Sequence, residues 1–164
     1  MIELGKAGVL ALLLDEHEVL VPGSVYEEAV TRGKRELYED AFGLEATLGG
    51  GGAEIFEPEA ISAEKEVPSL GPGELDALRA YREEGAGAVL SDDRVFLRFL
   101  QTVFVPYLTP ASVVVGFVGS ERLDVGEGLA ALDRLGPYIR VEAYRRARQE
   151  IQDMRTRRPK GEEG

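Results

Sequence analysis

The sequence predicts an α/β fold with three layers, α/β/α, around a mainly parallel sheet. Short runs of strand length alternate with segments of helical periodicity. Those strands are apolar along most of their length, as buried parallel strands are, and acidic residues come within a few positions after two of them. The length of 164 residues suits one domain with a hydrophobic core. We expect a single domain over residues 1–154 and a disordered basic tail over residues 155–164.

The net charge of −11 argues against a protein that coats nucleic acid by bulk electrostatics. The charge is uneven, however. Residues 145–164 contain seven Lys or Arg and four Asp or Glu, a local charge of +3 that leaves −14 for the rest of the chain. The acidic body is either a solubilising surface or a source of carboxylates that converge on a divalent cation.

Two residue types exclude whole classes of active site. With no cysteine, the chain has no disulfide, thiolate zinc site or cysteine nucleophile. Its one histidine, His17, excludes a catalytic triad and a histidine-rich metal site. No apolar run approaches the roughly 20 residues that span a bilayer, and no signal-peptide pattern is present. We therefore expect a cytoplasmic protein without a membrane contact.

The first 58 residues are predicted to contain three helices and two strands. In chain order these are helix 1–14, strand 18–21, helix 25–33, helix 34–48 and edge strand 53–58. The glycine run 49–52 could suggest a phosphate-binding loop, but no Gly-Lys-Ser/Thr comes after it and no strand precedes it. The run is therefore interpreted as a linker, and residues 59–70 give no prediction.

The stretch 71–96 predicts a helix, a buried strand and then adjacent acids. The turn Gly71-Pro72-Gly73 starts a helix near Glu74. Helical spacing places Glu74 at the edge of the buried face and Asp76 on a polar face that meets water. The strand 88–90 comes next, and residues 91–93, Ser-Asp-Asp, lie at its carboxyl end, where ligands bind in open α/β sheets.

The remaining elements repeat this alternation. They are predicted as helix 95–100, strand 102–106, and helices that begin at Thr109-Pro110, Asp124 and Val141. Residues 113–118 are rich in β-branched side chains and could equally form a strand, although the Thr-Pro start favours a helix.

Carboxylates are the remaining candidates for chemistry. They are Glu74, Asp92 or Asp93, and the pair Glu27-Glu28 after a strand. Hard oxygen ligands suit magnesium or manganese, which could activate water for attack on a phosphodiester. Two of these groups also have a structural explanation: Glu27 and Glu28 complement a helix dipole, and Asp92 or Asp93 can cap the next helix. Glu74 has none as simple, since a carboxylate on a buried face needs a partner. Helical geometry does not decide between Glu27 and Glu28.

Three segments together resemble the PIN domain family, the metal-dependent nuclease fold of VapC-type toxins and related prokaryotic ribonucleases. They read VLVPGSVYEEAV over 19–30, GPGELDALRAY over 71–81 and AVLSDDRVF over 88–96. The resemblance extends to about residue 151. It implies a toxin-like endoribonuclease that hydrolyses RNA phosphodiesters with magnesium or manganese.

The resemblance also implies the site residues. Metal ligands fall on Glu28, Glu74 and Asp93, and Asp92 is a neighbour that could substitute for Asp93. Ser91 matches the Ser or Thr of the family and would orient the neighbouring acid or a metal-bound water.

One departure from the family pattern bears on activity. PIN domains open with an apolar strand that ends in a metal-binding Asp, whereas residues 1–8 resemble the family's segment after that Asp. Either the true start lies upstream, or the domain has lost this strand. The first case predicts an active enzyme. The second predicts a catalytically degenerate PIN-like scaffold that binds an antitoxin-like protein or forms a homo-oligomer.

Overall fold

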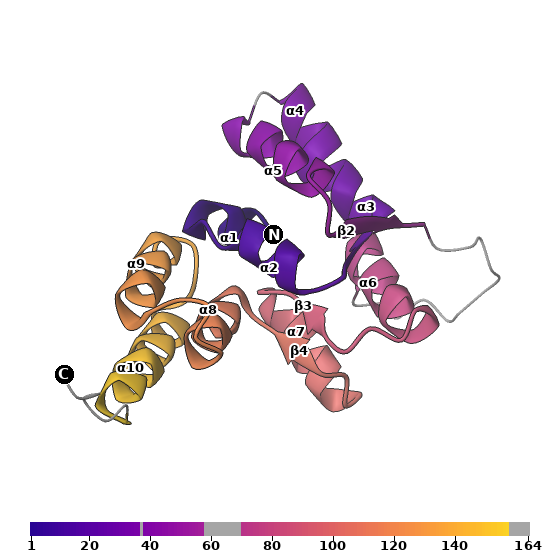
Figure 1. Cartoon of the computed structure of the whole chain (residues 1–164). Helices are drawn as coiled ribbons and strands as arrows, with labels where there is room; N and C mark the ends of the chain where they lie inside the picture. The colour runs from indigo at the N-terminus through magenta and orange to yellow at the C-terminus, as the bar shows by residue number, and fades with distance from the viewer. Residues whose placement is uncertain (37, 58–69, 158–164) are drawn as a thin grey trace.

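The computed structural model describes residues 1–36, 38–57 and 70–157, in which helices surround two small parallel sheets (Figure 1). Strand β1 (Val19–Pro22) pairs with β2 (Ala53–Phe56), and β3 (Val89–Leu90) pairs with β4 (Tyr107–Leu108). The predicted α/β class and its parallel strand pairing are confirmed. The strands form two sheets rather than one, and helix α6 (Pro72–Glu83) contacts both β1 and β3.

The predicted strand over 102–106 is wrong. Helix α7 (Arg94–Thr102) extends through its first residue, and the chain then turns with Phe104 at a φ of 57°. The amide of Val105 donates to the carbonyl of Leu100 at 2.9 Å, so this segment completes the helix end instead of joining a ladder. The strand β4 begins only afterwards.

The predicted first helix is divided into α1 (Ile2–Ala7) and α2 (Leu10–Glu16). Gly8 separates them at a φ of 74°, where its amide donates to the carbonyl of Gly5 at 2.9 Å. A glycine adopts this left-handed conformation without the steric penalty that a Cβ imposes, so the sequence itself provides the break.

The helical segment after β1 is longer than predicted. It runs through α3 (Gly23–Tyr26), the π-helical turn η1 (Glu27–Arg32) and α4 (Gly33–Arg35). Helix α5 (Glu39–Gly49) then starts five residues later than predicted, because the amide of Tyr38 bonds back to the carbonyl of Gly33 at 2.9 Å. The glycine linker at 49–52 joins it to β2.

Three helices complete the chain: α8 (Pro110–Gly119), α9 (Val125–Leu135) and α10 (Val141–Arg157). The helical interpretation of residues 113–118 is confirmed. Side chains of Thr109 and Asp124 cap α8 and α9, as their positions predict. Residues 155–157 are helical, whereas 158–164, the rest of the predicted tail, lie outside the described residues.

The core consists of two hydrophobic clusters. The larger cluster is built mainly from α1, α2 and α8–α10, with Leu4, Leu132 and Ile151 fully buried. The smaller cluster joins α6, β3 and α7 around Leu100. Strand β3 serves both, since Val89 belongs to the smaller cluster and Leu90 packs against the larger one.

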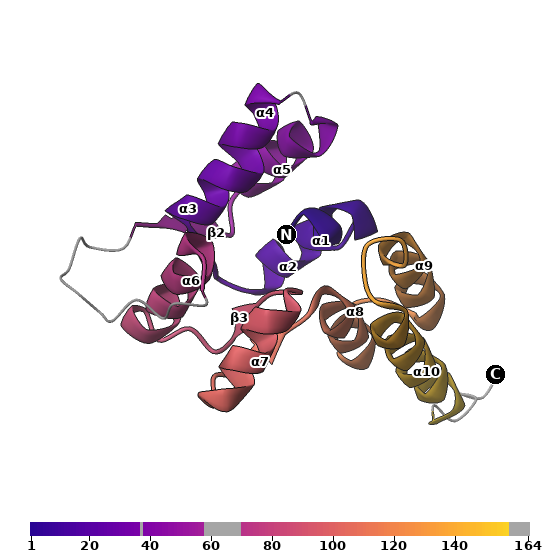
Figure 2. The same ribbon diagram turned by 180° about the vertical axis from the view of Figure 1, so that it is seen from behind.

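Helices α8, α9 and α10 form one end of the molecule, α3–α5 form the other, and α1 and α2 lie between them (Figure 2).

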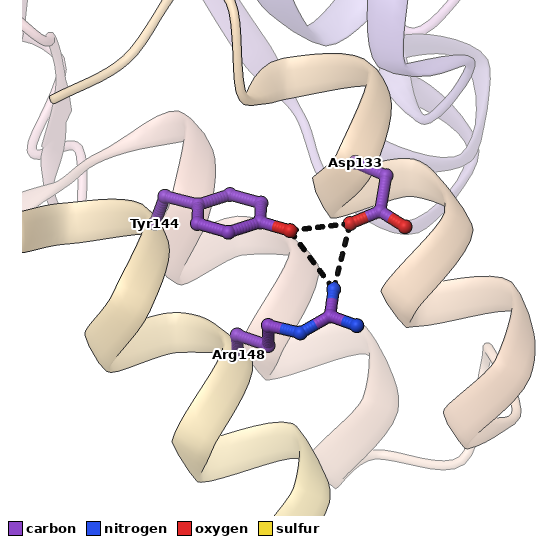
Figure 3. A network of polar contacts seen from close by, with 3 residues as sticks. All are labelled: Asp133, Tyr144 and Arg148. Carbon is purple, nitrogen blue, oxygen red and sulfur yellow. Dashed lines mark hydrogen bonds and ion pairs between the residues drawn. The ribbon is translucent and has the colours of Figure 1, made fainter. Parts of the chain in front are cut away.

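A network of polar contacts connects α10 to α9 (Figure 3). The Tyr144 hydroxyl donates to Asp133 at 2.6 Å, and Arg148 donates to Asp133 at 2.7 Å. The hydrogen bond to Asp133 raises the pKa of Tyr144.

Over the described ranges, no helix is both long and apolar enough to cross a membrane.

Candidate functional site

The carboxyl end of β1 brings a hydroxyl and a carboxylate together. Gly23 comes directly after the strand, and a Cβ there would overlap the Glu57 carboxylate, the flexible end of a side chain that would have to shift. The next residue, Ser24, donates its hydroxyl to Asp76 Oδ2 at 2.6 Å, across 52 positions in the sequence. The bond joins the start of α3 to the first turns of α6.

Asp76 is not in water, which corrects the prediction from helical phase. Its side chain is 14% exposed and also accepts from Arg79 Nη1 at 3.1 Å. The prediction failed because α3 covers this face of α6: a Cβ on Gly73 would lie 3.1 Å from the side chain of Val25. Helices α3 and α6, which are distant in sequence, therefore pack together over a face of α6 that is polar when the sequence of α6 is taken alone.

Glu74 closes the start of its own helix. Its Oε2 accepts from the amide of Gly71 at 2.7 Å, which is the glutamate half of a capping box, since Gly71 has no side chain to accept in return. The side chain is partly buried, as its position at the edge of the apolar face predicts. Its Oε1 has no hydrogen-bond partner among the residues that the structure describes.

The carboxyl end of β3 carries the second group of acids. Asp93 caps α7 by accepting from the amide of Phe96 at 2.7 Å, and Ser91 Oγ accepts from the amide of Asp93 at 3.1 Å. The capping interpretation is therefore confirmed for Asp93, through Oδ1 alone. Its Oδ2 stays without a partner within the described chain.

Asp92 has a different environment from Asp93. Burial raises the pKa of the Asp92 carboxyl, and the charge of Glu3 raises it further, whereas the amino group of Met1 opposes the shift. That amino group lies 3.4 Å from Glu3 Oε2. The first turn of α1 therefore lies near the carboxyl end of β3 and adds Glu3 to the two acids there.

Glu27 and Glu28 open the π-helical turn η1, and both are exposed. Neither side chain makes a hydrogen bond or an ion pair within the described part of the chain. The structure therefore leaves open which of the two is the functional acid.

Comparison with known proteins identifies the family. A family model described as DUF3368, a PIN domain, matches residues 1–153. The chain belongs to the PIN domain family. No curated protein and no solved structure matches it. The match spans α1 to most of α10, including the acids after β1 and β3, and PIN domains are in general a nuclease fold that uses divalent metals.

The acids of this PIN domain suit a divalent metal by chemistry but not by arrangement. Carboxylates are the ligands that hard cations prefer. Within residues 1–36, 38–57 and 70–157, however, no three or more His, Cys, Asp or Glu side chains form a group that could hold a metal ion. Glu28, Glu74 and Asp93 are thus not gathered into one site, and their role as ligands stays a prediction.

The sequence does not predict the environments of two acids of this PIN domain, Glu3 and Asp76. Glu3 reads as an ordinary first-turn acid, and no sequence signal places α1 beside β3. Asp76 pairs with a serine in another helix, which helical periodicity within α6 does not report. Both contacts depend on how the helices pack.

Proposed function

We propose that this PIN domain is a toxin-like endoribonuclease that hydrolyses RNA phosphodiesters and depends on magnesium or manganese. One observation carries the proposal: the PIN family match spans the whole segment that places acids at the carboxyl ends of β1 and β3. Ligands at those ends are typical of α/β folds, because rigid strands hold the loops that carry them. The RNA substrate is inferred from the resemblance to prokaryotic ribonucleases.

The proposed ligands are Glu28, Glu74 and Asp93, with Asp92 and Ser91 in support. Glu74 and Asp93 each use one carboxylate oxygen in a cap and keep the other without a partner in the described structure. Capping and metal binding are therefore compatible at both residues. The exposed Glu28 has both oxygens available by the same criterion.

Calorimetric titration with manganese tests the proposed ligands, and the chain supplies matched controls. Asp124 and Glu127 form a capping box at α9, with amide-to-carboxylate distances of 2.8 Å, like Asp93 and Glu74 in their own helices. We expect Glu74→Gln and Asp93→Asn to abolish manganese binding and cleavage of a labelled RNA. Asp124→Asn and Glu127→Gln remove a charge from the same kind of cap without removing its acceptor oxygen, and they should retain both.

Two results would overturn this function. One is an absence of binding at millimolar manganese. The other is an equal effect of all four substitutions, which would reduce the acids to helix caps.

A second candidate function is a catalytically degenerate PIN scaffold that binds a second copy of itself or an antitoxin-like protein. The observation that favours it is an apolar surface beside the edge strand β4. Phe104 is 92% exposed there, and Tyr107 and Leu108 of β4 are exposed as well. Light scattering separates the two functions, since a strictly monomeric chain that binds manganese and cleaves RNA eliminates the scaffold.

A further inference from the structure

A cavity of about 100 Å³ lies beside Asp92, between the start of α7, the start of α8 and the segment that joins α9 to α10. Its charged and aromatic lining consists of Asp92, Arg94, Tyr138 and Arg140. Ordinary small-molecule sites begin at about 300 Å³, so this cavity suits one group of a longer ligand better than a whole free molecule.

The cavity is cationic in an acidic protein. Two arginines and one aspartate give its lining a formal charge of +1, whereas the chain carries −11. Neither the Arg94 nor the Arg140 guanidinium makes a hydrogen bond or an ion pair within the part of the chain that the structure describes. Two arginines that line one small cavity therefore have side-chain donors without a protein partner in the described structure.

A cation–π contact lies next to the lining. The ammonium of Lys6 is 4.1 Å from the centre of the Tyr138 ring, and it is paired with Asp40 at 2.8 Å. Tyr138 itself is 50% exposed. The guanidinium fork matches the geometry of phosphate oxygens, which makes arginine the side chain best suited to bind a phosphodiester.

We propose that Arg94 and Arg140 bind a phosphodiester group of single-stranded RNA in this cavity and thereby position the strand beside Ser91, Asp92 and Asp93. This inference rests on the proposed ribonuclease function, because that function is the reason to expect RNA as the ligand. Asp92 lines the cavity and directly precedes the α7 cap, so a phosphate held here lies next to the acids after β3. Arg94 directly follows the cap residue Asp93, so it is also next to the acids after β3.

Binding of a fluorescent single-stranded RNA oligonucleotide in EDTA tests this inference without metal or cleavage. We expect the double variant Arg94→Gln, Arg140→Gln to weaken binding by about tenfold. The slope of log K against log salt should fall by about 0.7 for each arginine removed. Arg98→Gln, one turn along α7, and Arg145→Gln on α10 are matched controls: both residues are exposed and outside the cavity lining. They should change binding by less than about twofold.

The outcomes separate this inference from the proposed function. Equal weakening by the cavity variants and the controls, or no binding of RNA by the unaltered chain, would overturn it. Arginine-dependent binding in EDTA without cleavage in manganese would support the cavity and refute the ribonuclease. Thermal unfolding of each variant checks that the exposed substitutions leave the fold intact.

Discussion

Some acids of this protein cap helices, and others, such as Asp92, do not. Asp93 and Asp124 accept from backbone amides at the starts of α7 and α9, and Glu74 and Glu127 accept from the amides of the cap residues of α6 and α9. Asp92 takes no part in the α7 cap, although it is next to Asp93. Its burial and the nearby Glu3 make the charged form costly. Adjacent residues of one type therefore have different roles.

This cost predicts a pH-dependent effect of Asp92→Asn. The pKa of Asp92 is raised in the folded protein, so at neutral pH its ionisation destabilises the fold. The substitution should raise the melting temperature at pH 7. The gain should shrink as the pH falls through the raised pKa and vanish below the ordinary value of 3.8, where the carboxyl is neutral in both states.

Melting curves between pH 3 and pH 7 check the prediction, with Asp15→Asn as the control because Asp15 is exposed and makes no hydrogen bond or ion pair in the described structure. A gain that grows as the pH falls would contradict it.

At the level of elements, conformational requirements at element ends explain most differences from the predicted pattern. Gly8 divides the first helix, and Phe104 turns the chain where a strand was expected. The π-helical turn η1 begins at Glu27. A π turn changes the rotation per residue, so the angular positions of Glu27 and Glu28 differ from those on a regular α-helix. Counting at α-helical spacing could not have separated these two acids.

The break at Gly8 predicts opposite effects for two glycine substitutions. Gly8→Ala places a Cβ at a φ of 74° and should destabilise the fold by about 1–2 kcal/mol. Gly5→Ala lies inside α1, where a Cβ would have no atom within 4 Å, and should stabilise it by about 0.5–1 kcal/mol. Urea unfolding of the two variants checks this pair. The same sign for both would show that α1 and α2 form one helix in solution.

Contacts between α1 and α9 lie close to Gly8. Arg134 donates from Nε and Nη2 to the carbonyl of Ala7 at 3.0 and 2.7 Å, and it lies 3.5 Å from the position that a Cβ on Gly8 would occupy. The end of α1 is therefore held by a side chain 127 residues away. The glycine comes from the sequence, whereas the contact between Arg134 and the end of α1 comes from the packing of the two helices.

For the whole molecule, the two hydrophobic clusters determine how the protein responds to core mutations. Leu132 is fully buried in the larger cluster, and Leu100 is fully buried in the smaller one. Strand β3 connects the clusters by packing one residue against each. The smaller cluster has six buried members, so it has fewer contacts to compensate for a cavity.

Leu132→Ala and Leu100→Ala should each destabilise the protein by about 2–5 kcal/mol, because each removes a fully buried side chain. Hydrogen exchange should show faster opening of α6, β3 and α7 in Leu100→Ala than in the unaltered chain, with α8–α10 less affected. Leu108→Ala is the control, since Leu108 is 42% exposed and should change stability by about 0.5 kcal/mol or less. Uniform acceleration in Leu100→Ala would mean that the clusters unfold as one.

Several features could be predicted from the sequence because they depend on neighbours along the chain. The starts of α6, α8 and α9 are set by Gly71-Pro72, Thr109-Pro110 and Asp124, whose effects act within one helical turn. The run at β1 and its Pro-Gly end predict a strand and the helix after it. The order of these segments is also what carries the PIN resemblance.

Only the tertiary structure decided which polar groups meet. Ser24 bonds to Asp76 across 52 positions, and Glu3 lies near Asp92 although most of the chain separates them. Such contacts depend on how helices pack and not on local periodicity, so no spacing rule within one helix reports them. The sequence by itself therefore determined most of the elements, several of their caps and the family. The packing of α3 against α6 decided the burial of Asp76, because α3 is distant from α6 in sequence and covers its polar face.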